Sequence, residues 1–288
     1  MSDIIRYIDT DVVGGLGDGT SWANAYSTMA SWSAAEGTTI AASDRHLAYF
    51  RGATVDQAGS ALDFAAHGWT SEGTGELHLI GDLPNNPTSP DATKYAWKAW
   101  YVENPFKIGG IGSLKIKLLN LQRIFSGNYI GSGVHTNTGH NFNFTQTSCV
   151  DDWSAIASPN TPANIELDGV DTVSGVILRE DCLFIGPLTG DIEAGYKQGW
   201  TCNTNRCTFS GGFSSGLQYT HASIAANYLD CAIEMAGTGS GGTPVLNYCA
   251  TDTGTGTNSV TVTDWDLELT DKTSEDFTLL GASQLITA

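Results

Sequence analysis

A short phrase built around a cysteine recurs between Gly175 and Thr251, and it constrains the fold more than any other feature of the chain. Each copy has a polar residue before the cysteine, a variable residue after it and often a large apolar residue next, which is the alternation of a half-buried strand. The intervals between successive cysteines are 25, 24 and 18 residues. The cysteines of the four copies are Cys182, Cys207, Cys231 and Cys249.

A repeat of roughly 20 to 30 residues with strand character and turn residues predicts a parallel β-helix, in which each copy forms one coil. Equivalent residues of adjacent coils stack at about 4.8 Å, so the four cysteines are expected to form one structural column inside the solenoid, as small buried apolar residues. Cys149 is expected to start this column one coil earlier. A solenoid of roughly eight to ten coils would then be on the order of 45 Å long.

Two alternatives remain for the cysteines. The segment from Cys202 to Cys207 could close a small disulfide loop, although disulfides belong mainly to secreted proteins and no signal peptide precedes the chain. Zinc is the second alternative, but paired C-x-x-C knuckles and a histidine at ligand spacing are both missing from the sequence. We therefore expect no metal site and no cofactor.

The composition favours one turn-rich all-β domain. Glycine occurs 34 times, and charged residues make up only 15% of the chain. The formal net charge of −18 disfavours nucleic acid and anionic membranes as partners. No apolar run approaches the roughly 20 residues that span a bilayer, so membrane insertion is not expected. The start of the chain shows no secretion signal, so folding in a cytoplasm is expected.

The ends of the chain are expected to close the solenoid. Residues 1–38 contain a strand from Ile4 to Asp9 and apolar residues at helical spacing, which predict a short capping helix with Thr20 or Ser21 as its N-cap. Residues 39–253 would form the parallel β-helix. Residues 254–288 would form a C-terminal β element, because 260–269 alternates with period two. The apolar residues of the predicted helix are Trp22, Ala25, Tyr26, Met29 and Trp32.

Both ends also carry a family resemblance. The phrases Tyr7-Ile-Asp9 and Gly17-Asp-Gly-Thr-Ser-Trp-Ala-Asn-Ala-Tyr26 resemble the opening of single-stranded, right-handed β-helix proteins of the pectin-lyase-like group, above all the β-helical virion proteins and spikes of tailed bacteriophages. The segment Ser274-Glu-Asp-Phe-Thr-Leu-Leu-Gly-Ala-Ser-Gln-Leu-Ile286 is similar to their closing phrase. The resemblance implies a right-handed fold, and in spikes of this type the terminal cap is commonly where three chains intertwine.

Candidate catalytic residues come from the row just before the column cysteines, which is expected to face outward. This row is Asp181, Arg206, Asp230 and Tyr248. Asp181 and Asp230 are the candidates for a carboxylate pair, since glycoside hydrolysis needs two carboxyl groups about 5 to 9.5 Å apart. An intervening Arg206 would keep both carboxylates ionised and therefore poor as acids, so a salt-linked ladder is equally consistent with the pattern.

Other candidate sites rest on composition alone. An aromatic-rich segment from Lys94 to Lys107 fits core packing or a carbohydrate-stacking platform. The calcium site of a lyase could be built from Asp151, Asp152, Asp168 and Asp171, but no lyase signature accompanies these acids, and solvated turn acids are the plainer interpretation. The candidate ligand-binding residues are Trp97, Trp100, Tyr101, His135, His140, Arg206 and Tyr248.

These observations lead to a functional hypothesis and two alternatives. The chain is expected to be a structural protein of a tailed-phage virion, a small spike or capsid decoration protein assembled in the host cytoplasm. A homotrimer is expected, with other capsid or tail proteins as partners and host-surface polysaccharide as ligand. A hydrolase or lyase of the same fold that degrades polysaccharide is the first alternative, and a cellular adhesin is the second, because one fold hosts many functions.

Overall fold

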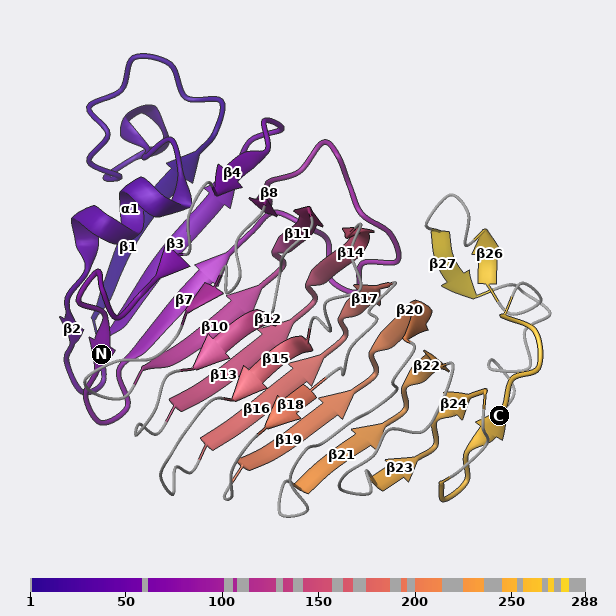
Figure 1. The fold of residues 1–288 in the computed structure, drawn as a ribbon. Coiled ribbons are helices and arrows are strands. Elements are labelled where there is room, and N and C mark those ends of the chain that lie inside the picture. The colour runs from indigo at the N-terminus through magenta and orange to yellow at the C-terminus, as the bar shows by residue number, and fades with distance from the viewer. Residues whose placement is uncertain are drawn as a thin grey trace.

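A computed structural model describes residues 2–58, 62–100, 106–107, 114–127, 132–136, 142–156, 163–167, 175–186, 193–195, 200–213, 225–235, 245–252, 256–265, 269–271 and 276–279. In the described residues the secondary structure is mainly β-strand, and the three long sheets are wholly parallel (Figure 1). Successive strands of one sheet are separated in sequence by strands of the other sheets, which is the order of a parallel β-solenoid. This confirms the predicted strand arrangement.

Sheet 1 holds β1 (Asp3–Asp9), β3 (Arg45–Arg51), β7 (Glu76–Ile80), β10 (Lys115–Leu119), β13 (Phe142–Thr147), β16 (Gly175–Glu180), β19 (Trp200–Asn205), β21 (Ala225–Leu229) and β23 (Val245–Asn247). Sheet 2 holds β4 (Asp56–Ala58), β8 (Ala96–Trp100), β11 (Gln122–Gly127), β14 (Val150–Ile156), β17 (Leu183–Ile185), β20 (Thr208–Phe213), β22 (Ala232–Met235), β24 (Ala250–Thr251) and β25 (Val260–Thr261). Sheet 3 holds β5 (Leu62–Asp63), β9 (Phe106–Lys107), β12 (Ser132–Thr136), β15 (Ala163–Leu167) and β18 (Glu193–Gly195). Among the described residues, sheets 1 and 2 thus have nine strands each, within the predicted eight to ten coils.

Two smaller pairs complete the strands. β2 (Thr39–Ile40) pairs in parallel with β6 (Thr70–Ser71), and β26 (Leu269–Asp271) pairs antiparallel with β27 (Asp276–Leu279). The strand predicted over 260–269 is divided, because β25 joins sheet 2 and β26 belongs to the terminal antiparallel pair.

The opening segment covers the free edge of β1. Tyr7 donates its N–H to the carbonyl of Gly19 and accepts from the N–H of Tyr26, and Asp9 donates to the carbonyl of Tyr26. Trp22 packs on Tyr7 with ring centroids 4.6 Å apart, and the guanidinium of Arg51 lies 4.1 Å from the Trp22 ring centroid. An exposed edge strand offers unpaired main-chain groups to other chains, so this segment acts as a cap.

The predicted helix begins later than expected. Residues Trp22–Asn24 form only a 3₁₀ turn (η1), and helix α1 spans Met29–Glu36. Its N-cap is Thr28, which forms a capping box with Ser31, and not Thr20 or Ser21. The reason is a tertiary contact that local periodicity does not contain: Tyr26 must be extended to pair with β1. Met29 and Trp32 of α1 pack into the core.

Side chains alternate between the solenoid interior and the outside, as β10 illustrates with Ile116 and Leu118 buried between half-exposed neighbours. Aromatic residues stack in the interior from coil to coil. Phe184 and Phe209 occupy equivalent positions on β17 and β20, with ring centroids 4.5 Å apart and an interplanar angle of 10°. These stacks and the main-chain ladders tie each coil to the next.

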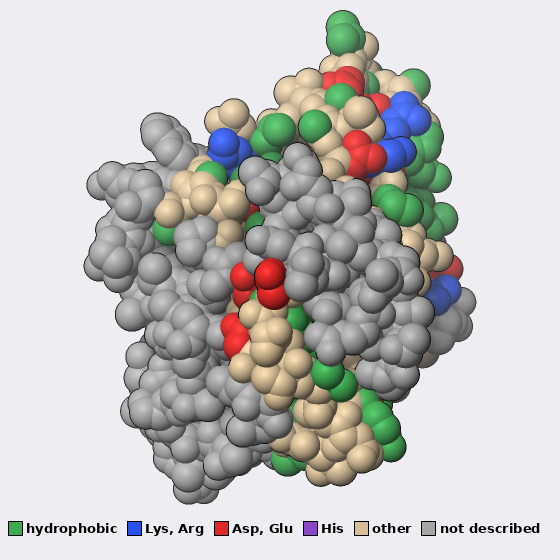
Figure 2. Space-filling model, turned by 90° about the vertical axis from the view of Figure 1, so that its right-hand side faces the viewer, with side chains coloured by type: hydrophobic (Ala, Val, Ile, Leu, Met, Phe, Trp, Pro, Cys, Tyr) green, Lys and Arg blue, Asp and Glu red, His purple; other side chains and the backbone are tan. Residues whose placement is uncertain are grey.

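Acidic side chains are prominent on the face in Figure 2, where some gather at the centre and others lie beside basic side chains near the top. Within the described ranges, no helix has the length and apolar character needed to cross a bilayer.

Candidate functional site

The polar row that precedes the cysteines lies at the turn from sheet 1 to sheet 2, and we call it the turn row. Each member has a positive φ between 51° and 54°, the left-handed region that residues other than glycine seldom occupy. One such residue per coil redirects the chain from one sheet into the next. The members are Asn120, Ser148, Asp181, Arg206, Asp230, Tyr248 and Asn258.

Main-chain hydrogen bonds between coils hold these turns. The N–H of Asp181 donates to the carbonyl of Asn205 at 3.2 Å, and the N–H of Arg206 donates to the carbonyl of Leu229 at 2.9 Å. The same bond recurs along the row, so the backbone conformation does not depend on the local preference of the side chain. This explains how an arginine and a tyrosine can occupy a conformation that costs an L-residue roughly 1–2 kcal/mol.

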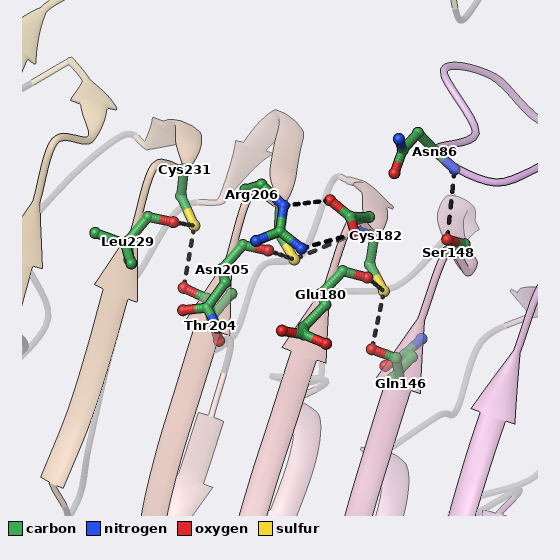
Figure 3. Close-up of polar contacts among 12 residues, drawn as sticks. Asn86, Gln146, Ser148, Glu180, Cys182, Thr204, Asn205, Arg206, Leu229 and Cys231 are labelled. Carbon is green, nitrogen blue, oxygen red and sulfur yellow. Dashed lines mark hydrogen bonds and ion pairs between the residues drawn. The ribbon is translucent and has the colours of Figure 1, made fainter.

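The residue after each turn packs beneath it and is buried at every position except the last, Ser259, which is half-buried. Five of these positions are Cys149, Cys182, Cys207, Cys231 and Cys249, each at most 2% exposed, and Leu121 and Ser259 hold the equivalent places at the two ends. Figure 3 shows the thiols pointing back to the ends of the sheet 1 strands. For example, Cys182 donates to the carbonyl of Glu180 at 3.2 Å. A small side chain with a weak donor therefore satisfies the carbonyl two residues earlier.

All six cysteines are free thiols, so the structure contains no disulfide between Cys202 and Cys207. Cys202 lies in the interior on β19, away from the turn row. Burial away from water raises the pKa of the Cys149, Cys207 and Cys231 thiols well above its usual value. These three thiols thus stay protonated, which makes them poor nucleophiles and poor metal ligands. The effect of burial on Cys182 is outweighed by hydrogen bonds from Cys149 and Cys207, which lower the pKa of its thiol, and a hydrogen bond from Cys231 lowers the pKa of Cys249.

Asp181 and Arg206 form a two-pronged ion pair on the outside of the turn row (Figure 3). The Nε and Nη2 atoms of Arg206 lie 2.7 and 2.9 Å from the two carboxylate oxygens of Asp181, and this contact raises the pKa of the guanidinium further above its usual value. Both oxygens of Asp181 are therefore already engaged. The Arg206 side chain is 53% exposed, and Tyr248 is 60% exposed.

The acids proposed for calcium binding occupy different environments. Asp151 is wholly buried and pairs with the buried Arg123, with N–O distances of 2.8 and 2.6 Å. The expectation that it is a solvated turn acid was wrong, since Asp151 sits in a strand of the solenoid interior opposite its partner in the adjacent coil. Asp152 is 8% exposed and accepts the N–H of Ser154. Asp168 and Asp171 lie outside the described residues.

The aromatic and histidine candidates do not assemble into one described surface. Trp97 is 1% exposed and packs edge-on against Phe106, so it belongs to the core and offers no face for a sugar. The backbones of Trp100 and His135 belong to β8 and β12. Tyr101 and His140 lie outside the described residues. In the part of the chain that the structure describes, no group of three or more His, Cys, Asp or Glu residues could hold a metal ion.

Sequence reasoning missed the backbone conformation of the turn row and its extension to Asn120, Ser148 and Asn258. A signal was available, since Asn, Asp and Ser recur just before the buried position and favour such turns. It also missed the buried pair of Arg123 and Asp151, because strand alternation alone places charged residues outside. Comparisons with protein-family models, curated proteins and solved structures found no match to this chain.

Proposed function

We propose that this protein is a structural component of a tailed-phage virion, a small right-handed β-helical spike or capsid decoration protein that assembles as a homotrimer. The observation that carries the proposal is the uninterrupted ladder of turns and buried thiols, which repeats through successive coils and leaves only the outward side chains of the row variable. Such a ladder makes a rigid shaft with a changeable surface, which suits a virion part exposed to harsh conditions. The resemblance of the opening and closing segments to phage β-helical proteins supports the same assignment.

The chemistry of the described residues also supports a structural role over catalysis. The Asp181 carboxylate is engaged on both oxygens by Arg206, whereas hydrolysis of a glycosidic bond needs a carboxyl group that can exchange a proton with the substrate. The buried thiols are likewise turned toward main-chain carbonyls.

The exposed side chains of the turn row are the part of this shaft that we assign to recognition. Arg206 offers a planar cation and Tyr248 an amphipathic ring. Together with Asp230 they occupy the same row on three successive coils. Both side-chain types are favoured where proteins contact ligands. We propose host-surface glycan as the ligand of this row.

The mass of the native protein in solution tests the assignment. Light scattering with and without SDS at room temperature should give an SDS-resistant species of about three times the 30.4 kDa chain mass, because intertwined β-helical chains bury a face that one chain leaves open. A monomer that cleaves polysaccharide would overturn the proposal in favour of an enzyme. If such an activity were found, the Asp181→Asn and Asp230→Asn variants would show whether the turn row carries it.

A further inference from the structure

A cavity of about 400 Å³ lies at the N-terminal end of the solenoid, between the first two strands of sheet 1 and the chain that leaves α1. It is open to solvent and well separated in sequence from the turn row. Its polar lining comes from Arg6 on β1, Glu36 at the end of α1, Thr38, Thr39 on β2, Asp44 just before β3 and His46 on β3.

The cavity exists because the cap covers the core only in part. Ile4, Arg6 and Ile8 share the interior side of β1, and Ile4 is the register partner of His46 on β3. Helix α1 covers Ile8 with Met29 and Trp32, which belong to the same core cluster. The helix ends at Glu36 and does not reach the other two interior positions of β1. Ile4 and Arg6 therefore face an open space.

Hydrogen-bonding groups around this space have unused capacity. Arg6 donates Nε to Glu36 Oε1 at 2.6 Å and Nη1 to the carbonyl of Ile5, but its Nη2 has no partner among the described residues. Glu36 Oε1 also accepts from Tyr26, and Glu36 Oε2 makes no bond within that part of the chain. Asp44 accepts the Ser2 N–H on Oδ1 and also a side-chain hydrogen bond from Ser2, so the unused groups are those of Arg6 and Glu36.

His46 is the strongest indication of a ligand. Its side chain lines the cavity and packs edge-on against Trp69 with centroids 5.3 Å apart, and the residue is only 5% exposed. Neither ring nitrogen has a hydrogen-bond partner among the described residues. Both nitrogens are reached by solvent through the open cavity, so a molecule bound there would meet one donor and one acceptor on the ring.

The charges and donors select the ligand class. Two carboxylates face one guanidinium, which disfavours an anion, and the described side chains provide no set of three metal ligands. Burial lowers the pKa of His46, so at neutral pH its ring carries one donor and one acceptor. A ligand that both donates and accepts hydrogen bonds complements this lining, and a hydroxyl group does both without a net charge.

We propose that this cavity binds a neutral polyhydroxylated molecule of the size of a sugar residue, held by Arg6, Glu36, Asp44 and His46. The volume lies within the range of about 300–1,000 Å³ typical of small-molecule sites. The proposal concerns a site at the capped end and does not depend on the virion role or on glycan contacts of the turn row.

The test uses the full chain and a panel of glucose, galactose, mannose and N-acetylglucosamine, with n-propylammonium as a cationic probe. Saturation-transfer NMR identifies binders, and calorimetric titration measures their affinity for the wild type and for His46→Phe, Glu36→Gln and His78→Phe. His78 lies on the outer side of β7 and does not line the cavity, which makes His78→Phe the matched control.

At least one sugar is expected to bind, and His46→Phe should weaken it about tenfold, because two hydrogen bonds to the ring nitrogens are lost. Glu36→Gln should also weaken binding while keeping an acceptor for Arg6 and Tyr26, so the proposal remains testable if His46→Phe does not fold. Absence of binding by every sugar, binding of n-propylammonium alone, or an equal loss in His78→Phe would overturn the proposal.

Discussion

Two ion pairs with the same two-pronged geometry but opposite environments allow a sharp prediction about stability. Arg123 and Asp151 are 1% and 0% exposed inside the solenoid, whereas Arg206 and Asp181 are 53% and 21% exposed on its surface. Removing one partner of a buried pair leaves an uncompensated charge and typically costs about 3–5 kcal/mol. Asp151→Asn is therefore expected to lower the free energy of unfolding by about 3–5 kcal/mol.

The exposed pair is the internal control, because water and salt screen its charges. Arg206→Gln should leave the denaturation midpoint almost unchanged. The double variant Arg123→Met with Asp151→Leu should be far more stable than the sum of its single changes implies, since it removes both buried charges together and packs apolar groups beside Phe125. Equilibrium unfolding in urea, followed by circular dichroism, measures the wild type, Asp151→Asn, Arg206→Gln, the double variant and its two single variants, Arg123→Met and Asp151→Leu. Equal shifts for Asp151→Asn and Arg206→Gln, or strict additivity in the double variant, would refute this reasoning.

The thiols, the turns and the buried histidines make three further predictions. A thiol reagent should label no cysteine of the folded protein and all six after unfolding, because every thiol is buried; rapid labelling of the native state would contradict this packing. Asp230→Val should lower the free energy of unfolding by about 1–2 kcal/mol, because a β-branched residue resists a positive φ, whereas Asp230→Gly should not lower it. Equal losses in the two variants would argue against backbone strain at this position. Burial lowers the pKa of His46 and His78 below 6.5, so these two histidines bind protons more readily in the unfolded chain. Their contribution to the free energy of unfolding should therefore be fully present above pH 6.5 and decrease as the pH falls below it. Melting curves at about pH 7.5 and about pH 5.5 measure this loss, and a variant with both histidines changed to phenylalanine should show less of it.

The fold could be predicted from the sequence because its main determinant is periodic. Cysteines at intervals near one coil length, often followed two residues later by an apolar residue, indicate stacked parallel strands without any knowledge of long-range contacts. The start of α1 could not be placed in this way, since it depends on Tyr26 pairing with β1. The pair of Arg123 and Asp151 was equally hidden, because its partners lie in different coils and alternation treats each charge as outward-facing.

The candidate site was predictable in position but not in conformation. The residues that immediately precede the column cysteines lie in one row, as predicted; they are Asp181, Arg206, Asp230 and Tyr248. Their shared positive φ is set by hydrogen bonds to the next coil, which no local propensity for arginine or tyrosine would suggest. The cavity at the cap was likewise hidden, because it depends on where α1 ends relative to β1 and β3.

Tyr248 provides the clearest test of whether the turn row is kept for its surface. Asparagine adopts a positive φ more easily than tyrosine, and the Tyr248 ring is 60% exposed, so little packing is lost when it is replaced. Tyr248→Asn should therefore be as stable as the wild type or more stable by up to about 1 kcal/mol. A residue that strains the backbone without stabilising the fold is best explained by what its side chain contacts outside the chain. Chemical denaturation of Tyr248→Asn, with Asn258→Tyr as the reciprocal change, measures the cost directly. If Tyr248→Asn were strongly destabilised, the tyrosine would be part of the packing, and its assignment to recognition would be wrong.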